Sequence, residues 1–362
     1  MKWFVRSLVG AICLVVVAVL GFQLFKTQIA EIAFKKAIEA NVGRDASTEL
    51  PDGLHVFMCG AGTPLPDPLR AGPCLGVIAG DRSFVFDAGS GGTRNLARMR
   101  FPLGRTERVY LTHLHSDHMD GLGELLMQAW VNGQRDEPLP VSGPRGVDEV
   151  VDGFNAAYRI DGTFRTAHHG ADIANPAGRG GAGEAIALPA GPGSRAVVLD
   201  DNGLKITAFS VSHAPVEPAF GYRVDYKGRS VLISGDTIYD PNLVAVAEGV
   251  DILFHEALDP EMVGVMHDAA AANGADHLAK ILDDILTYHA PPADAARAAT
   301  EAGARELVFY HTIPPLPSHL LNDYYIRDAK KVFDRKITVS EDGMVFSLPA
   351  GSDTINRHDG FK

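Results

Sequence analysis

The sequence predicts a layered α/β fold, an αββα sandwich in which helices cover two sheets, preceded by an N-terminal transmembrane helix. Short apolar strands separated by glycine-rich turns begin near Leu54, and helical segments alternate with them without a strict βαβ rhythm. The chain also divides into two similar halves, each with strands capped by helices. With 362 residues, 46% of them apolar, it is long enough to bury a sizeable core.

The N-terminal segment is predicted to anchor the chain in a membrane. Ser7–Phe25 contains no charged residue, and about 19 helical residues at about 1.5 Å each span the hydrocarbon layer of a bilayer. A cleaved signal peptide is the alternative, although no small-x-small cleavage site follows the apolar run. Lys2 and Arg6 lie close together before the run, which favours a cytoplasmic amino end and a main domain that is periplasmic or extracellular.

Composition divides the chain into four parts. We expect residues 1–25 to form the anchor, residues 26–53 a stalk and linker, residues 54–350 the main folded domain, and residues 351–362 a polar tail that frays. Lys26–Val42 carries apolar residues between charges, which predicts a helical stalk or, alternatively, a solvated first helix of the domain.

Within the main domain, residue patterns predict the order of strands and helices. Runs of apolar and β-branched residues predict strands at His55–Cys59, Gly76–Gly80, Ser83–Asp87, Arg108–Thr112, Arg195–Leu199, Leu204–Ser210, Phe220–Tyr226, Ser230–Ser234, Ile252–His255 and Glu306–Tyr310. Segments with helical character are Thr93–Met99, Leu122–Trp130, Val147–Tyr158, Asn242–Glu248, Leu278–Leu286, Ala293–Ala302 and Tyr324–Phe333. Ile160–Gly193, with several glycines and prolines, predicts a mobile surface loop or a lid over a site.

Charge and cysteine content limit the partners of the chain. A formal charge of −12 argues against broad nucleic-acid binding, because affinity for a polyphosphate comes mostly from lysine and arginine; a local basic rim that overrides this average is the alternative. The three cysteines lack zinc-finger spacing, so any metal would be held by nitrogen and oxygen. We expect Cys59 and Cys74 to be two separate buried thiols; a disulfide outside the cytosol is the alternative.

The most specific pattern lies between a predicted strand and a predicted helix, in Thr112–Gly121. This segment places three histidines and a carboxylate within six positions, at His113, His115, Asp117 and His118. Imidazole nitrogens and carboxylate oxygens are common ligands of zinc. Loops positioned by a rigid scaffold often carry chemistry, so the segment predicts a metal site.

Three further candidate ligands also follow strand-like segments. They are His213, Asp236 and His311. Each of these residues alone would more often be structural. Because four separate strand ends offer metal-ligating side chains, the combination favours a metal centre.

This arrangement resembles the metallo-β-lactamase superfamily, whose fold is an αββα sandwich with a metal centre between the two sheets. The resemblance implies that a first zinc ion is held by His113, His115 and His213. It implies that a second is held by Asp117, His118 and His311, and that Asp236 bridges both. The implied cofactors are two Zn²⁺ ions, with Mn²⁺ or Fe²⁺ as alternatives.

Within the superfamily, the chain most resembles ribonuclease Z and its relatives, over most of Leu54–Leu348. The supporting segments are Gly60–Pro64, Phe86–Gly89, Ser212–Pro215, Phe220–Arg223 and His255–Ala257. The resemblance implies that His289 is a proton donor, although a surface histidine is the alternative. Glu256 is a candidate to orient His289.

One departure bears on the substrate. Ribonuclease Z enzymes commonly carry a long arm that grips transfer RNA, between the segments matching Phe220–Arg223 and Ser234–Thr237. Here only Val224–Ile233 intervenes, which is too short for such an arm. The resemblance therefore supports the catalytic centre better than a transfer-RNA substrate, and related sulfatases become candidates.

The expected chemistry is hydrolysis of a small anionic ester. Two Zn²⁺ ions, two carboxylates from Asp117 and Asp236, and a bridging hydroxide leave a net charge near +1, which favours a phosphodiester or a related ester. The hydroxide would attack, Asp117 would orient it, and His289 would protonate the leaving oxygen.

Three readings remain open. The first is a membrane-anchored dinuclear zinc phosphodiesterase. The second is an arylsulfatase or a lactone or β-lactam hydrolase, and the third is an inactive, metal-stabilised binding protein. The membrane, through residues 7–25, and a second copy of the chain in a homodimer are candidate partners.

Overall fold

The computed structural model of the chain describes residues 2–191 and 193–362, which form two compact units, residues 1–45 and 46–362. The first unit contains α1 (Lys2–Asn41), a single helix of 40 residues. Within it, Gly10–Asn41 is long and apolar enough to cross a membrane, with a mean hydropathy of 2.0 over its most apolar window, none of which is buried. The predicted anchor and stalk helix are therefore one continuous helix.

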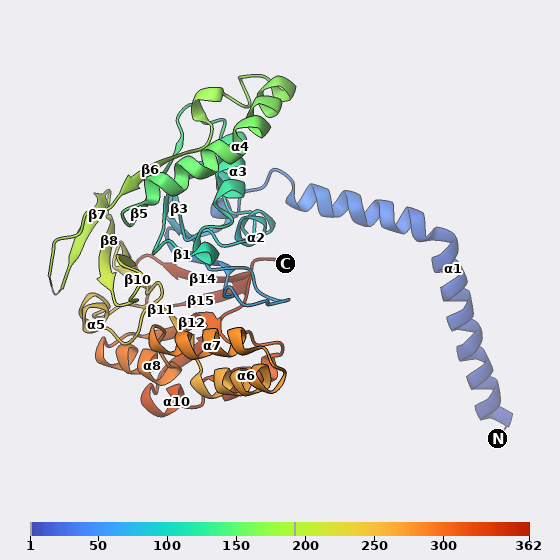
Figure 1. The fold of residues 1–362 in the computed structure, drawn as a ribbon. Coiled ribbons are helices and arrows are strands. Elements are labelled where there is room, and N and C mark those ends of the chain that lie inside the picture. The colour runs from blue at the N-terminus through green and yellow to red at the C-terminus, as the bar shows by residue number, and fades with distance from the viewer. Residues whose placement is uncertain (1, 192) are drawn as a thin grey trace. The chain divides into compact units, whose positions relative to one another are not determined.

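The second unit contains two sheets (Figure 1). The first sheet has the order β15 (Asn356–Asp359), β14 (Met344–Pro349), β1 (Gly53–Gly60), β2 (Cys74–Ala79), β3 (Arg82–Phe86), β4 (Thr106–Tyr110), β5 (Leu139–Gly143) and β6 (Gly181–Ala185). The second has the order β13 (Lys336–Val339), β12 (Glu306–Ile313), β11 (Ile252–Leu258), β10 (Arg229–Ile233), β9 (Ala219–Tyr226), β8 (Leu204–Val211) and β7 (Arg195–Asp201).

Helices cover the outer faces of both sheets (Figure 1). The first sheet is covered by α2 (Gly92–Arg98), α3 (Leu122–Gly133) and α4 (Val147–His169). Over the second sheet lie α5 (Pro241–Val246), α6 (Pro260–Ala272), α7 (Asp276–Asp284), α8 (Pro292–Glu301), α9 (Asn322–Tyr325) and α10 (Ala329–Val332). The predicted αββα sandwich is therefore confirmed.

The two-residue period of the strands explains the layering. In β1, Val56 and Met58 point into the core between the sheets, whereas Phe57 and Cys59 pack under the helices of the first sheet. All eight residues of β1 are buried, as expected for a strand covered on both faces.

The structure corrects two predictions about loops and tails. The expected mobile loop of residues 160–193 is wrong for much of its length, because α4 continues to His169 and β6 pairs with β5. α4 continues through Gly162. The Arg179 side chain packs against this glycine so closely that an added Cβ would come within 2.2 Å of the Arg179 Cδ. The tail does not fray either: β15 pairs with β14, and Arg98 lies over the Phe361 ring.

Several elements were not predicted at all. They are α6, β5, β6, β13, β14 and β15. Four of these strands have four or five residues, and β5 and β6 contain proline or glycine, so their sequences carry little periodicity.

A disulfide joins Cys59, near the end of β1, to Cys74, at the start of β2. The expectation of two separate thiols is therefore wrong. The sequence was compatible with separate thiols or a disulfide, because it is the pairing of β1 with β2 that brings the two cysteines together. Cys13, in α1, is free and exposed.

Breaking this disulfide is expected to destabilise the second unit. For Cys59→Ser/Cys74→Ser we expect the free energy of unfolding to fall by about 3 kcal/mol, because the bond restricts a loop with a sequence separation of 15 in the unfolded chain. Urea unfolding of the purified full chain in detergent measures the change. Cys13→Ser is the matched control. An unchanged unfolding midpoint in the double variant would show that the bond does not stabilise the fold.

Candidate metal centre

The predicted ligands meet at the carboxyl ends of strands from both sheets. His113–His118 follow β4, His213 follows β8, Asp236 follows β10, and His311 lies near the end of β12. The structure brings eight side chains together in three overlapping groups, in each of which the ligand atoms lie within 4.8 Å of one another. The eight are His113, His115, Asp117, His118, His213, Asp236, His289 and His311.

The first group has the spacing of a four-coordinate metal site. His115 Nδ1 lies 3.0 Å from His113 Nε2 and 3.4 Å from His213 Nε2. Asp236 Oδ2 lies 3.8 Å from His113 Nε2 and 3.9 Å from His213 Nε2. Tetrahedral bonds of about 2.0–2.1 Å place neighbouring donors about 3.4 Å apart. The donor set and its spacing therefore fit a zinc-sized cation.

The second group, Asp117, His118 and His311, lies beside Asp236 of the first. Asp117 Oδ2 lies 3.1 Å from His311 Nε2 and 3.5 Å from His118 Nε2. Asp236 Oδ1 lies 3.4 Å from His118 Nε2, while Oδ2 lies 3.5 Å from His311 Nε2. Asp236 thus lies near nitrogens of both groups, with Oδ2 close to His213 and His311 and Oδ1 close to His118, so its carboxylate is placed between the two sets of donors.

Four buried atoms of the centre lack hydrogen-bond partners among the described residues, and two of them, His118 Nε2 and Asp236 Oδ1, lie 3.4 Å apart. The other two are His289 Nδ1 and His311 Nδ1. Buried polar atoms without partners are rare in folded proteins because the loss of water is not compensated. A cation between His118 Nε2 and Asp236 Oδ1 would satisfy both, so the structure independently supports the fit of a metal ion.

Burial and neighbouring charges shift the pKa values of the centre. Burial lowers the pKa of His113 well below its usual value, and repulsion from His118 adds to this effect. Burial alone would lower the pKa of His118, but the charges of Asp236, Asp117 and Asp87 raise it well above its usual value. Burial alone would raise the pKa of Asp236, but His311 and His118 hold it well below its usual range. The carboxylate at the middle of the centre therefore stays ionised.

Neighbouring groups fix the orientation of the ligand rings. His118 Nδ1 donates to Asp87 Oδ2 at 2.8 Å, and Thr112 N–H donates to Asp87 Oδ1 at 2.8 Å. His213 Nδ1 donates to the carbonyl oxygen of Tyr288 at 2.9 Å. A hydrogen bond at one ring nitrogen leaves the other free to bind a metal. Asp87, in a left-handed conformation with φ 55° just after β3, is not among the predicted site residues, although it lies in the supporting segment Phe86–Gly89.

Asp87→Ala is expected to weaken metal binding by about 10–100-fold, because His118 would lose the partner that orients its ring. Competition with a chromogenic chelator measures the metal affinity of the purified full chain. Asp251→Ala is the matched control, since Asp251 is also a buried carboxylate but pairs with Arg229, away from the centre. If both variants lose metal equally, Asp87 acts on the stability of the fold and not on the ligands.

His289 and Glu256 lie together beside the metal ligands. His289 Nδ1 is 3.2 Å from Glu256 Oε1 and 4.0 Å from Asp236 Oδ2. The Glu256 carboxylate is fully buried, and it accepts hydrogen bonds from the backbone N–H groups of Thr237 and Ala290 at 3.2 and 3.0 Å. Burial alone would lower the pKa of His289, but the charges of Glu256 and Asp236 raise it. The predicted pair is therefore in contact and favours a protonated imidazole.

Tyr288 is a second residue that sequence patterns missed. Its ring centroid lies 5.2 Å from that of His213 and 4.9 Å from that of His289. The side chain is half-buried, so it packs against the centre while part of it stays exposed. The backbone carbonyl of Tyr288 therefore accepts a hydrogen bond from the candidate ligand His213, and its ring forms an aromatic surface at the edge of the site.

Two helix-covered sheets with histidine and aspartate side chains gathered at their strand ends are typical of a hydrolase fold that can hold metal ions. The chain belongs to the metallo-β-lactamase superfamily, because residues 82–312 match the model of the Beta-lactamase superfamily domain. It is 34% identical over 265 residues to Ribonuclease Z of Mycobacterium avium (strain 104), covering 73% of this chain and 87% of the relative. It is 31% identical over 291 residues to Ribonuclease Z of Mycolicibacterium gilvum (strain PYR-GCK), covering 80% and 94%. These relatives indicate a ribonuclease Z-like hydrolase.

Solved structures agree on the fold. The human short-form tRNase Z has a TM-score of 0.56 and 23% sequence identity, and the match covers 82% of this chain and 99% of that one. The metallo-beta-lactamase fold protein YhfI from Bacillus subtilis has a TM-score of 0.58 and 21% identity, covering 82% and 100%.

Proposed function

We propose that this chain is a membrane-anchored hydrolase that binds two zinc ions and cleaves a phosphodiester or a related anionic ester. The observation that carries the proposal is the position of Asp236, whose carboxylate oxygens lie 3.4–3.9 Å from histidine nitrogens of both donor groups. Two adjacent divalent ions would supply hydroxide at neutral pH and would neutralise the nonbridging oxygens of the ester.

Side chains of the protein would donate the proton that the leaving group needs. His289 would protonate the departing oxygen, because it lies beside the ligands and its raised pKa keeps a proton available. Glu256 would hold the His289 ring in place while its own carboxylate is fixed by two backbone donors. Asp117, the least buried member of the second group, would orient the attacking oxygen.

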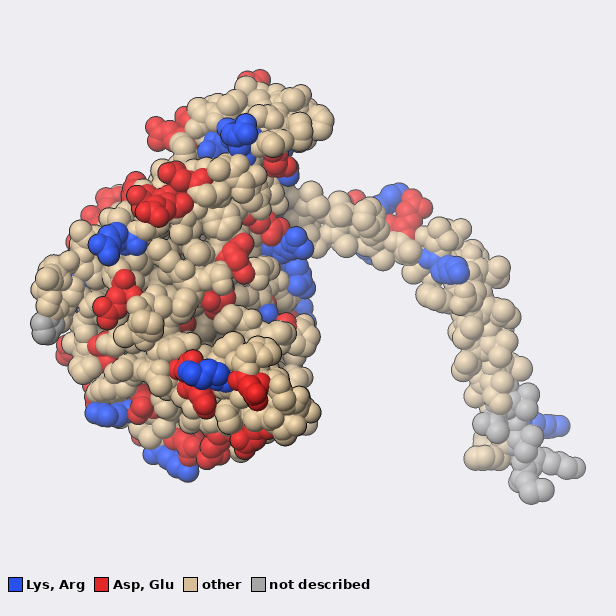
Figure 2. Space-filling view, in the orientation of Figure 1, with Lys and Arg blue, Asp and Glu red and all other residues tan. Residues whose placement is uncertain are grey.

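The substrate is proposed to be small and not a transfer RNA. The strands β9 and β10 join through the turn Lys227–Gly228, which leaves no room for an arm between them. On the visible face, acidic and basic side chains are intermingled (Figure 2), and the chain carries a formal charge of −12. Tight binding of a polyanion needs clustered cations, so these charges favour a single anionic group as substrate.

The location is proposed to be outside the cytosol. The exposed apolar stretch of α1 suits a bilayer, and the Cys59–Cys74 disulfide suits an oxidising compartment. Fusing a reporter that is active only in the periplasm or only in the cytosol after Lys362 tests the orientation. Activity of the cytosolic reporter alone would overturn this part of the proposal.

A parallel assay of the zinc-loaded full chain in detergent tests the activity. The substrates are a bis-aryl phosphate, an aryl sulfate, a lactone, a cephalosporin and a precursor transfer RNA. We expect the highest kcat/KM on the phosphodiester. The highest value on the sulfate, lactone or cephalosporin would assign one of the alternative hydrolases, and activity on precursor transfer RNA alone would restore the RNA assignment. Failure on every substrate with two zinc ions bound would favour an inactive binding protein.

A further inference from the structure

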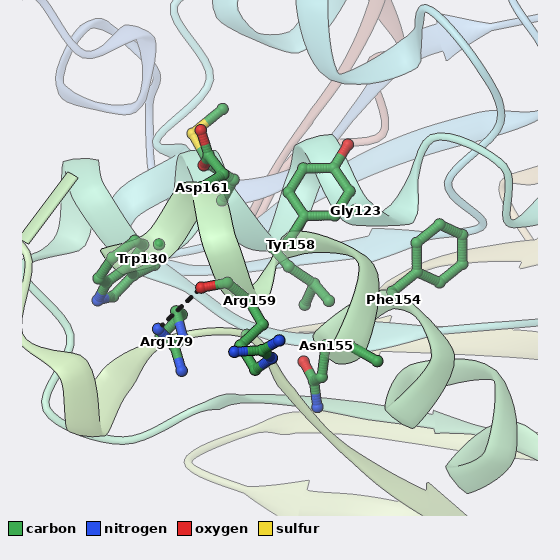
Figure 3. A pocket seen from close by; sticks show the side chains of 13 residues that line it. Gly123, Trp130, Phe154, Asn155, Tyr158, Arg159, Asp161 and Arg179 are labelled. Carbon is green, nitrogen blue, oxygen red and sulfur yellow. Dashed lines mark hydrogen bonds between the residues drawn. The ribbon is translucent and has the colours of Figure 1, made fainter. Parts of the chain in front are cut away.

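A cavity of about 350 Å³ lies between α3 and α4, apart from the metal centre. Figure 3 shows the side chains around it, contributed by both helices and by the segment before β6. None of the described residues that line it is among the eight side chains of the candidate metal centre. The cavity is therefore a separate feature of the fold.

Aromatic side chains form much of the wall. Trp130 comes from α3, while Phe154 and Tyr158 come from α4 (Figure 3). Trp130 is almost fully buried and its indole N–H donates to the carbonyl oxygen of Asn175 at 2.7 Å, which fixes the ring. The Tyr158 ring lies against Gly123, where an added Cβ would come within 2.3 Å of the ring. Flat rings held in this way suit an aromatic ligand.

The charged groups at the cavity are predominantly basic. Arg159 and Arg179 both line it, and Arg179 Nη1 donates to the Arg159 carbonyl oxygen at 3.4 Å (Figure 3). Among the described residues, neither guanidinium has a carboxylate partner. Asp161 also lines the cavity, but its carboxylate accepts from Arg165 Nε at 2.7 Å. In a chain of net charge −12, two unpaired guanidinium groups beside an aromatic wall favour an anion.

We propose that this cavity binds an aromatic anion, a molecule of about two rings that carries one carboxylate or sulfonate. Its rings would pack against Phe154 and Tyr158, close to the buried Trp130, and its anionic group would accept hydrogen bonds from Arg159 and Arg179. The site needs neither the metal ions nor the hydrolytic activity. An uncharged ring system of the same shape would bind more weakly, because it gains only the aromatic contacts.

Energy transfer from tryptophan tests this site. The chain has two tryptophans, Trp3 and Trp130, so Trp3→Phe leaves Trp130 as the only donor. The full chain in phosphatidylcholine vesicles is titrated with 1-anilinonaphthalene-8-sulfonate, and with N-phenyl-1-naphthylamine, which has the same rings without the sulfonate. We expect saturable emission from the sulfonate upon excitation of Trp130, with at least tenfold tighter binding than that of the neutral amine.

Substitutions identify the groups responsible. Arg159→Gln and Arg179→Gln, each in the Trp3→Phe background, should weaken sulfonate binding about tenfold and change binding of the amine less than twofold. Arg94→Gln, which removes the same charge at an exposed site on α2, should change neither. Equal weakening of both probes, or no weakening in either cavity variant, would overturn the proposal. Loss of binding in His115→Ala/Asp117→Ala would place the probe at the metal centre and would also overturn it.

Discussion

His115→Ala/Asp117→Ala is expected to lower kcat/KM by at least about a thousandfold and to reduce the zinc content below one ion per chain. His115 belongs to the first group of donors and Asp117 to the second, so the double variant removes a ligand from each. Metal-assisted generation of hydroxide and charge neutralisation together contribute several kcal/mol, and about 1.4 kcal/mol corresponds to a tenfold change in rate.

Elemental analysis and steady-state kinetics on the same preparation check this result. His168→Ala/His169→Ala is the matched control, because these two histidines are exposed at the end of α4 and lie outside the centre. We expect the control to keep its metal and its rate. Unchanged hydrolysis and two bound zinc ions in the His115→Ala/Asp117→Ala variant would rule out the assigned centre.

His289→Ala is expected to lower the rate by about 10²–10⁴-fold on esters with a poorly acidic leaving group, such as an alkyl alcohol. The same variant should lose much less activity on a 4-nitrophenyl ester, because 4-nitrophenolate departs without protonation. The zinc content should not change, since His289 is proposed to donate a proton and not to bind the metal. Glu256→Gln, which keeps the shape but removes the charge beside His289, should show the same dependence on leaving group with a smaller loss.

Kinetics on the two ester classes, with metal analysis, measure this pattern. His277→Ala, at an exposed position on α7, is the matched control and should behave like the unaltered chain. An equal loss on both classes accompanied by loss of zinc would make His289 a ligand. An equal loss with zinc retained would assign it to substrate binding.

Much of the central architecture could be predicted from local patterns. The strands β8, β10 and β12 are apolar runs. His213 lies shortly after β8, Asp236 lies shortly after β10, and His311 lies near the end of β12, so the strand ends and the candidate ligands could be predicted together. The short outer strands could not be predicted from the sequence, because they are stabilised by pairing with neighbouring strands and not by a periodic pattern of their own. β15, for example, is a polar segment that is ordered by pairing with β14.

Other features depended on contacts between distant residues. Asp87 orients His118 across 31 positions of sequence, and its role follows from a backbone turn after β3 that no composition rule indicates. The Glu256–His289 contact joins the end of β11 to the segment before α8. Cys59 and Cys74 could have been thiols or a disulfide until strand pairing set their Cα atoms 5.0 Å apart.

The sequence by itself determined which ligand types are present, the order in which they follow the strands, and the sandwich of two helix-covered sheets. These properties are local, since hydrophobic periodicity sets the strands and side-chain chemistry sets the ligands. Only the tertiary structure decided that Asp236 lies near both groups of donors, that Asp87 holds His118, and that residues of α3 and α4 together line a cavity with aromatic and basic side chains. Those properties depend on distances between residues far apart in the chain, which packing fixes and no local pattern encodes.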